Sequence, residues 1–233
     1  MKFSMSGVTA VGGRDCNEDS IFIRGNRKRA LAVVADGLGG HGGGDAASSA
    51  AVGVAAKHLQ KMRTVTSDDM RAAVSQANDA AALCAGAKTT IAVLYIDEAG
   101  ALAAHAGDTR IYQFRGGEII AQSLDHSVSQ MAVSVGEITQ DEIRHHIDRN
   151  KLLRALGASE TVNADIRELP ARKGDAFLLC TDGFWELVLE NEMMESLQAA
   201  KNARQWLKKM LVTVKKKITE TGDNYSAVAI MLS

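Results

Sequence analysis

Three apolar segments of the sequence carry an aspartate at one end. RALAVVADGLG and DAFLLCTDGFW each end with Asp-Gly, at Asp36 and Asp182, and the last apolar run follows Asp223 in GDNYSAVAI. If central strands of one sheet bring these ends together, the carboxylates repel one another unless one stays protonated or a cation neutralises them. The simplest relief is a divalent metal ion. Asp-Gly after a strand is also a turn signal, so spacing alone leaves a metal centre and ordinary turns as alternatives.

The ligands of such a centre would be hard oxygen donors, which favours Mg²⁺ or Mn²⁺ over zinc. Two ions sharing a carboxylate would suit activation of water for attack on phosphorus. Near the amino terminus, GGRDCNEDS adds Arg14 and the pair Glu18-Asp19. The arginine could grip a phosphate dianion with its planar fork, and the acids could contribute to the metal shell through water. Taken alone, this segment also fits an ordinary polar loop.

Composition restricts the class of protein. The 233 residues are 46% hydrophobic and 24% charged with a single proline, which predicts one globular domain over residues 1–233. The formal net charge is -1 and no basic stripe is interleaved with aromatic residues, so nucleic acid is not an expected partner. No apolar run fits a signal peptide or a membrane span, and three cysteines without CxxC spacing fit isolated thiols. We therefore expect a cytoplasmic protein that does not bind membranes.

The apolar pattern predicts an alternation of sheets and helices. Two alanine-rich helices are expected, one opened by Asp45 and one by Ser67 or Asp68. Short β-prone segments over 89–123 predict an antiparallel meander, and the polar residues 127–150 predict a mobile flap or a small helical insertion. DAFLLCT and YSAVAIML predict two further strands, with a helical stretch between them. Such an order favours stacked layers of sheets and helices.

Seven segments together carry a family resemblance. RDCNEDS, VVADGLGGHGGGDAAS, GDTRIYQFRGGEI, LDHS, RNKLLRALG, LLCTDGFWE and DNYSAVAI resemble, in this order, the motif series of the PPM family of metal-dependent Ser/Thr protein phosphatases in its bacterial form. The resemblance runs from about Arg14 to the carboxyl terminus. It implies an α+β fold with a central antiparallel β-sandwich flanked by pairs of helices, in four layers α-β-β-α. The metal centre would lie in the cleft at one edge of the sandwich.

The resemblance also implies a role for each matching position. Two Mn²⁺ or Mg²⁺ ions, with a weaker third, would be held by the following residues: Asp36 as the bridge, Gly37 through its carbonyl, Asp182 and Asp223 on one ion, Glu18 and Asp19 largely through water, and Asp108 with Asp182 at the third site. Arg14 would bind the phosphate. The six glycines among the eight residues after Asp36 would let the chain turn sharply and expose the Gly37 carbonyl.

The implied activity is hydrolysis of phosphoserine and phosphothreonine by direct attack of a metal-bound hydroxide, with Arg14, Asp36 and Asp182 as the catalytic set. The expected partners are phosphorylated proteins and a bacterial Ser/Thr kinase that the enzyme opposes, and the enzyme is expected to be a monomer. Some family members place a histidine after this Asp-Gly, but here the residue is Leu38, so no general acid is assigned. His41 could contact the substrate.

Two other functions stay open at this point. One is a catalytically silent module of the same fold that binds phosphoproteins, although the intact acidic set argues against it. The other is a phosphatase for small-molecule phosphates, because residues 127–150, which would choose substrates, are the least readable part of the sequence.

Overall fold

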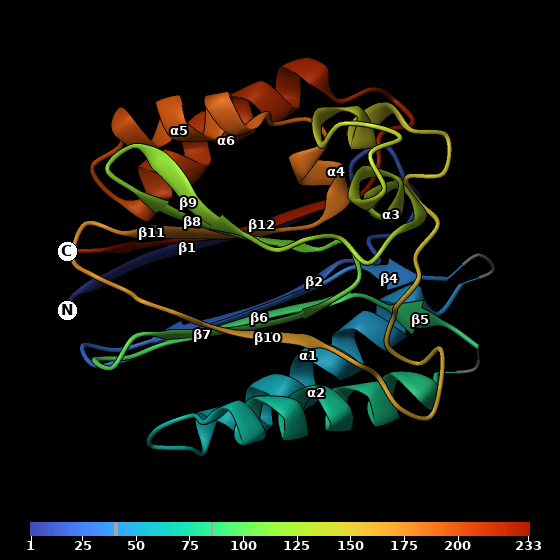
Figure 1. Ribbon diagram of the computed structural model, residues 1–233, viewed down its shortest axis with the longest axis horizontal. Helices are drawn as coiled ribbons and strands as arrows, with labels where there is room; N and C mark the ends of the chain where they lie inside the picture. Colours follow the sequence, from blue (N-terminus) through green and yellow to red (C-terminus); the bar gives the residue numbers. More distant parts are fainter. Residues whose placement is uncertain (40–41, 85) are drawn as a thin grey trace.

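Two antiparallel sheets face each other in the computed structural model, which describes residues 1–39, 42–84 and 86–233 (Figure 1). Within these residues, each of the two main sheets has five strands. The first has the order β1 (Phe3–Ala10), β12 (Tyr225–Leu232), β11 (Ala176–Cys180), β8 (Arg110–Arg115) and β9 (Glu118–Gln122). The second has the order β10 (Asp165–Leu169), β7 (Ala101–Ala106), β6 (Ile91–Ile96), β3 (Ala30–Ala35) and β2 (Ser20–Gly25).

Pairs of helices cover the outer faces of both sheets. Helices α1 (Gly44–Gln60) and α2 (Ser67–Ala82) lie against the second sheet, and α5 (Glu190–Gln198) and α6 (Ala203–Lys217) lie against the first (Figure 1). The four layers α-β-β-α expected from the resemblance are therefore confirmed.

The central strands read as unbroken apolar runs because they are buried on both faces. In β3, Leu31 and Val33 pack toward α1 and α2, whereas Ala32 and Val34 pack toward the other sheet. The period of two in a strand thus distributes one apolar run between two cores. A third core lies between the first sheet and α5 and α6, with Trp206 among its buried residues.

Helix starts differ slightly from the predicted ones. Thr66, one residue before the predicted start of α2, accepts from Asp69 N at 3.2 Å, while the Asp69 carboxylate accepts from Thr66 N at 2.9 Å. This reciprocal capping box explains the start of α2. Helix α1 begins after Gly43, whose φ of 96° favours glycine, and Asp45 lies in its first turn.

The prediction of one meander over 89–123 is wrong. Strands β6 and β7 form a hairpin in the second sheet, whereas β8 and β9 form a hairpin in the first. The chain crosses between the sheets at Gly107, which has a φ of 105°. Local turn signals do not say which sheet the next strand joins, because both sheets bury apolar residues on their inner faces. The crossing places Asp108 at the edge of the sandwich.

Residues 127–150 contain two short helical segments, α3 (Val128–Ser134) and η1 (Asp141–His145). Arg144 of η1 is buried and donates to Glu190 Oε2 at 2.7 Å and to the Trp185 carbonyl at 3.2 Å. The segment is therefore anchored to the end of α4 (Asp182–Trp185) and to the start of α5.

The long helical stretch predicted after β11 is divided in two. Helix α5 ends at Gln198, and Asn202 then caps α6 by accepting from Gln205 N at 2.9 Å. Strands β1 and β10 at the sheet edges were not predicted. In the described ranges, the structure has no helix that is both long and apolar enough to cross a membrane.

Candidate metal centre

The three aspartates identified at strand ends meet at one end of the sandwich, but they come from both sheets. Asp36 follows β3 of the second sheet, whereas Asp182 follows β11 and Asp223 precedes β12 in the first. β11 and β12 pair antiparallel, and Thr181 N donates to Ser226 O at 3.0 Å where this pairing ends. The premise that one sheet carries all three ends is therefore wrong, while their convergence is correct.

Asp36 is held by its backbone. Its N–H donates to Thr90 Oγ1 at 2.9 Å, and its carbonyl accepts from Thr90 N at 2.8 Å and from Thr89 Oγ1 at 2.7 Å. These bonds set the position of the residue without using its carboxylate. The carboxylate therefore stays available to a ligand.

Gly37 begins the short strand β4 (Gly37–Leu38), which pairs with β5 (Lys88–Thr89). Its N–H donates to the Glu18 carbonyl at 3.1 Å. A Cβ at this position would overlap the carbonyl oxygen of Gly44 at the start of α1. Glycine is required here by a close approach of two backbone segments.

Asp182 and Asp223 each accept from the next backbone N–H. Gly183 N donates to Asp182 Oδ1 at 2.6 Å, and Asn224 N donates to Asp223 Oδ1 at 2.8 Å. Arg14 Nη2 donates to Asp223 Oδ2 at 2.8 Å, and both side chains remain partly exposed. The structure thus brings Arg14 to the same place as the two aspartates.

Asn224 ties the amino-terminal loop to the Asp223 loop. Its Nδ2 donates to the carbonyls of Val11 and Cys16 at 2.7 and 2.9 Å, and its Oδ1 accepts from Glu18 N at 2.8 Å. Segments more than 200 residues apart in the sequence are joined by one amide group.

Asp19 and Asp108 are buried beside these residues. Asp19 Oδ2 accepts from Thr181 Oγ1 at 2.9 Å, whereas Asp19 Oδ1 and Ser226 Oγ are buried without a hydrogen-bond partner in the part of the chain that the structure describes. The Asp108 carbonyl accepts from Trp185 Nε1 at 3.0 Å. An orphaned carboxylate oxygen in a buried site is an observation that a bound cation or an ordered water would explain.

Glu18 lies against the start of α1. A Cβ added to Gly44 would lie 2.6 Å from Glu18 Oε1, and one added to Gly39 would lie 2.8 Å from the same atom. Its carboxylate is therefore beside the helix amino terminus, where negative charge is favourable.

The pKa values of this cluster are raised. Burial, and then the charge of Asp182, raise the pKa of Asp36 and of Asp108 well above the usual range. Burial, and then the charge of Asp223, raise the pKa of Asp182. Burial raises the pKa of Asp19 to about 7, although the Thr181 hydroxyl that donates to it opposes the shift. Carboxylates that cannot all ionise together fit a site for divalent cations, so the residues present suit the expected metal.

A cavity of about 270 Å³ opens beside the cluster. Arg14, Asp182 and Asp223 line it together with Arg149 and Glu186, which are not among the predicted site residues. Arg149 Nε donates to Glu186 Oε1 at 2.9 Å. Burial, and then the charge of Asp182, raise the pKa of Glu186. Arg149 begins the RNKLLRALG segment and Glu186 ends LLCTDGFWE, so both lie in segments of the family resemblance, but neither has a role among those that the resemblance implies.

Among the histidines, His41 lies outside the described residues. The rings of His105 and His126 stack with centroids 4.6 Å apart, and Gly107 N donates to His126 Nδ1 at 3.2 Å. Ligand atoms of His105, His126 and Asp165 all lie within 4.8 Å of one another, as in a metal site. Arg154 Nη1 lies 3.1 Å from His126 Nε2 and 3.0 Å from Asp165 Oδ1, so a cation of the chain already occupies this group.

Known proteins are similar to this chain in sequence and in fold. Residues 7–222 match the family model for protein phosphatase 2C. The serine/threonine phosphatase stp of Listeria monocytogenes is 30% identical over 199 residues, which cover 80% of this chain and 79% of that protein. PstP of Mycobacterium tuberculosis is 35% identical over 199 residues, which cover 78% of this chain and 36% of that protein.

Solved structures agree with the sequence matches. The crystal structure of the M. tuberculosis serine/threonine phosphatase PstP/Ppp has a TM-score of 0.85 and 28% identity, and covers 100% of both chains. The PPM Ser-Thr phosphatase MsPP of Mycobacterium smegmatis, in complex with cacodylate, has a TM-score of 0.86 and 27% identity, and the match covers 99% of this chain and 98% of that one. The motif resemblance is thereby confirmed, and the chain belongs to the protein phosphatase 2C family, the PPM serine/threonine protein phosphatases.

Proposed function

We propose that the chain removes phosphate from phosphoserine and phosphothreonine in proteins with the help of two divalent ions, Mn²⁺ or Mg²⁺, at the Asp36–Asp182 cluster. The observation that carries this proposal is the crowding of carboxylates, Asp19 and Asp108 buried and Asp36 and Asp182 half-buried, whose pKa values are raised by burial and by one another's charge. A solved structure of the PstP catalytic domain in complex with two manganese ions, which is 26% identical to this chain, supports the choice of ion.

The residues that would hold the ions are those implied by the family pattern. Asp36 would bridge them, the Gly37 carbonyl would bind one, and Asp182 and Asp223 would bind the other. Asp19 and Glu18 would act through water, and Asp108 would serve a third, weaker ion. When bound, the ions neutralise the carboxylates and activate water for attack on phosphorus.

Arg14 would orient the substrate phosphate. It lines the cavity beside Asp182, and its guanidinium reaches the cluster through Asp223. A planar fork suits a phosphate group because it donates two parallel hydrogen bonds. Arg149, which lines the same cavity, adds a second positive charge for a phosphoprotein that enters it.

The group that protonates the leaving serine or threonine is not supplied at the position after Asp36-Gly37. Leu38 lies in β4, paired with Lys88, and offers no proton. Bulk water can protonate the leaving oxygen in an open cleft, so the missing histidine does not argue against hydrolysis.

Opposition to a Ser/Thr kinase is part of the proposal. Its support is that relatives from several bacteria are named serine/threonine phosphatases. The same names support phosphoserine and phosphothreonine in proteins as the substrates.

The test is release of phosphate from a phosphothreonine peptide by wild type and by Asp182→Asn, with Mn²⁺, with Mg²⁺ and with EDTA. We expect metal-dependent release by wild type and a loss of at least 100-fold in the variant, which keeps the size of the side chain but loses its charge. Peptide binding without turnover in excess Mn²⁺ would instead support the silent binding module. Full activity in EDTA would overturn the metal assignment.

A further inference from the structure

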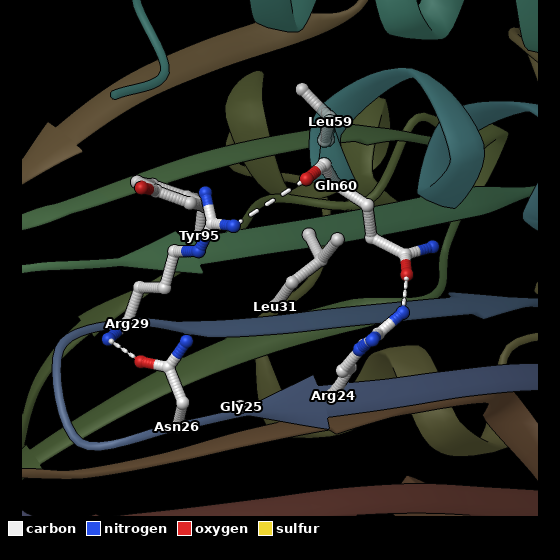
Figure 2. Close-up of a pocket in the computed structure, with 8 residues that line it drawn as sticks. All are labelled: Arg24, Gly25, Asn26, Arg29, Leu31, Leu59, Gln60 and Tyr95. Carbon is white, nitrogen blue, oxygen red and sulfur yellow. Dashed lines mark hydrogen bonds between the residues drawn. The ribbon is translucent and has the colours of Figure 1, made fainter. Parts of the chain in front are cut away.

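A second cavity, also of about 270 Å³, lies at the other end of the β2–β3 hairpin from the metal centre (Figure 2). It is lined by the following residues: Arg24, Gly25, Asn26, Arg29, Leu31, Leu59, Gln60 and Tyr95. Strand β2 starts beside Asp19 and ends at Gly25, and six residues at about 3.3 Å each put the cavity about 20 Å from the cluster. The cavity is therefore separate from the catalytic cleft.

Two guanidinium groups converge on one residue in this cavity. Arg24 donates to Gln60 Oε1, and Arg29 Nη2 lies 3.5 Å from the Gln60 carbonyl while Nη1 donates to the Met62 carbonyl. Figure 2 shows both side chains directed at Gln60, one from β2 and one from the turn before β3. A guanidinium has five N–H donors, so most of these donors have no acceptor among the described residues.

Neither guanidinium forms a salt bridge among the described residues, although Asp97 and Glu98 line an adjoining cavity together with Arg29. None of the lining residues, all of which are described, is acidic. The exposed side chains of Arg27 and Lys28 in the same turn add to the positive potential at the rim. Leu31, Leu59 and Tyr95 are almost fully buried and form a wall of low polarity, which strengthens the attraction of an anion.

The turn that carries Arg29 is ordered by its own sequence. Asn26 Oδ1 accepts from Lys28 N at 2.8 Å and from Arg29 N at 3.2 Å, and Asn26 N donates to the Arg29 carbonyl at 2.9 Å. These bonds position Arg29 opposite Arg24 before any ligand binds. A preformed site loses less conformational entropy on binding.

We propose that this cavity is a second anion site that binds a phosphate monoester or inorganic phosphate as the dianion. Two guanidiniums without a salt bridge among the described residues match two negative charges, and their planar forks match phosphate oxygens. The volume is just below that of pockets for drug-sized ligands, which suits a single anionic group. The site does not depend on the proposed hydrolysis, because none of its residues belongs to the metal centre.

The test is an NMR titration of the full-length protein with inorganic phosphate, in EDTA and at constant ionic strength. Amide signals of Gly25, Asn26 and Gln60 report on the second cavity, and those of Gly183 and Asn224 report on the catalytic cleft. We expect saturable shifts at the first three signals. Arg24→Gln should weaken this binding at least tenfold, because it removes one of the two guanidiniums. Among the described residues the Arg24 side chain donates one hydrogen bond, to the side-chain amide of Gln60, so its loss should not unfold the chain.

Arg27→Gln is the matched control. It removes the same charge from the turn that follows β2, but Arg27 does not line the cavity. We expect its affinity for phosphate to stay within twofold of wild type, and we expect Arg24→Gln to hydrolyse p-nitrophenyl phosphate at the wild-type rate. Equal weakening by both substitutions, or shifts confined to Gly183 and Asn224, would overturn the site and leave Arg24 and Arg29 as structural links to α1.

A second titration distinguishes a phosphoprotein from free inorganic phosphate as the ligand. A phosphoserine peptide and its unphosphorylated form replace inorganic phosphate in the same titration. Tighter binding of the phosphopeptide than of inorganic phosphate supports the site and assigns it to phosphoproteins. Saturable binding of inorganic phosphate alone supports a site for the free ion. Binding of neither, or of both peptides equally, would contradict it.

Discussion

The indole Nε1 of Trp185 donates to the carbonyl oxygen of Asp108 at 3.0 Å, and this bond joins α4 to the crossing between the two sheets. The guanidinium carbon of Arg110 lies 3.5 Å from the centroid of the Trp185 ring, and Arg110 pairs with Asp125 through bonds of 2.8 and 2.7 Å. A buried stack thus sets the position of Asp108 relative to Asp182, which begins the same helix as Trp185. We expect the candidate metal centre to depend on this stack of Trp185, Arg110 and Asp125, none of which is an expected ligand.

Replacing Trp185 with Phe should lower both stability and activity. An aromatic ring is kept, although a smaller one, but the buried Asp108 carbonyl loses its N–H donor, which costs about 1–3 kcal/mol. Because Asp108 and Asp182 lose a common anchor, we expect kcat for a phosphopeptide to fall about tenfold. Urea unfolding and steady-state kinetics measure the two effects.

Trp206→Phe is the control for this substitution. Trp206 is equally buried and donates to the Met193 carbonyl at 3.0 Å, but it lies between α5 and α6. A similar loss of stability with an unchanged kcat is expected. Equal losses of kcat in both variants would show that the Trp185 bond has no special effect on the site.

Gly37→Ala should inactivate the protein. The added methyl group would overlap the Gly44 carbonyl and push α1 away from Asp36, so we expect a loss of at least 100-fold in phosphate release. Gly53→Ala in α1 is the contrasting variant, since nothing lies within 4 Å of its Cβ position. It should stabilise the protein by about 0.5–1 kcal/mol. Normal activity of Gly37→Ala would contradict the close approach of β4 and α1.

Stability without metal should depend on pH through Asp19. Its pKa is raised from 3.8 to about 7 in the folded state, so between these values the folded protein binds more protons than the unfolded chain. The contribution of Asp19 to the free energy of unfolding is therefore greatest at and below pH 4 and falls as pH rises toward 7. Asp19→Asn should stabilise the metal-free protein at pH 7 by roughly 2–4 kcal/mol, and this gain should vanish near pH 4.

Urea unfolding at several pH values in EDTA measures this dependence. Excess Mn²⁺ should reduce the advantage of Asp19→Asn, because a cation lets the cluster stay ionised. Thr181→Val, which removes the hydroxyl that donates to Asp19, should instead lower the free energy of unfolding at pH 7. An Asp19→Asn variant whose stability follows wild type at every pH would refute the raised pKa.

Arg149→Ala should weaken binding of phosphopeptides more than it slows their hydrolysis. Arg149 lines the catalytic cavity and pairs with Glu186 rather than with an expected metal ligand. We expect KM to rise about fivefold to tenfold with kcat within threefold of wild type. Lys151→Ala is the control, because Lys151 pairs with Asp148 and does not line the cavity. A fall in kcat at unchanged KM would place Arg149 in the chemical step instead.

The sequence by itself determined the family and the layered fold, because ordered motifs and unbroken apolar runs are local properties. It also located the Asp-Gly ends at Asp36 and Asp182 and the helices that begin near Asp45 and Ser67. The buried strands could be predicted from local sequence alone, since a strand covered on both faces must be apolar throughout.

Only the tertiary structure decided which sheet each strand joined and what surrounds the acids. The bond from Arg14 to Asp223 spans 209 positions, and the pair Arg149–Glu186 joins an insertion to a helix after β11. Local patterns carry no information on such contacts, because they depend on how elements pack rather than on the elements themselves. The cavity lined by Arg24 and Gln60 also depends on packing, because it forms where the turn of the β2–β3 hairpin meets the end of α1.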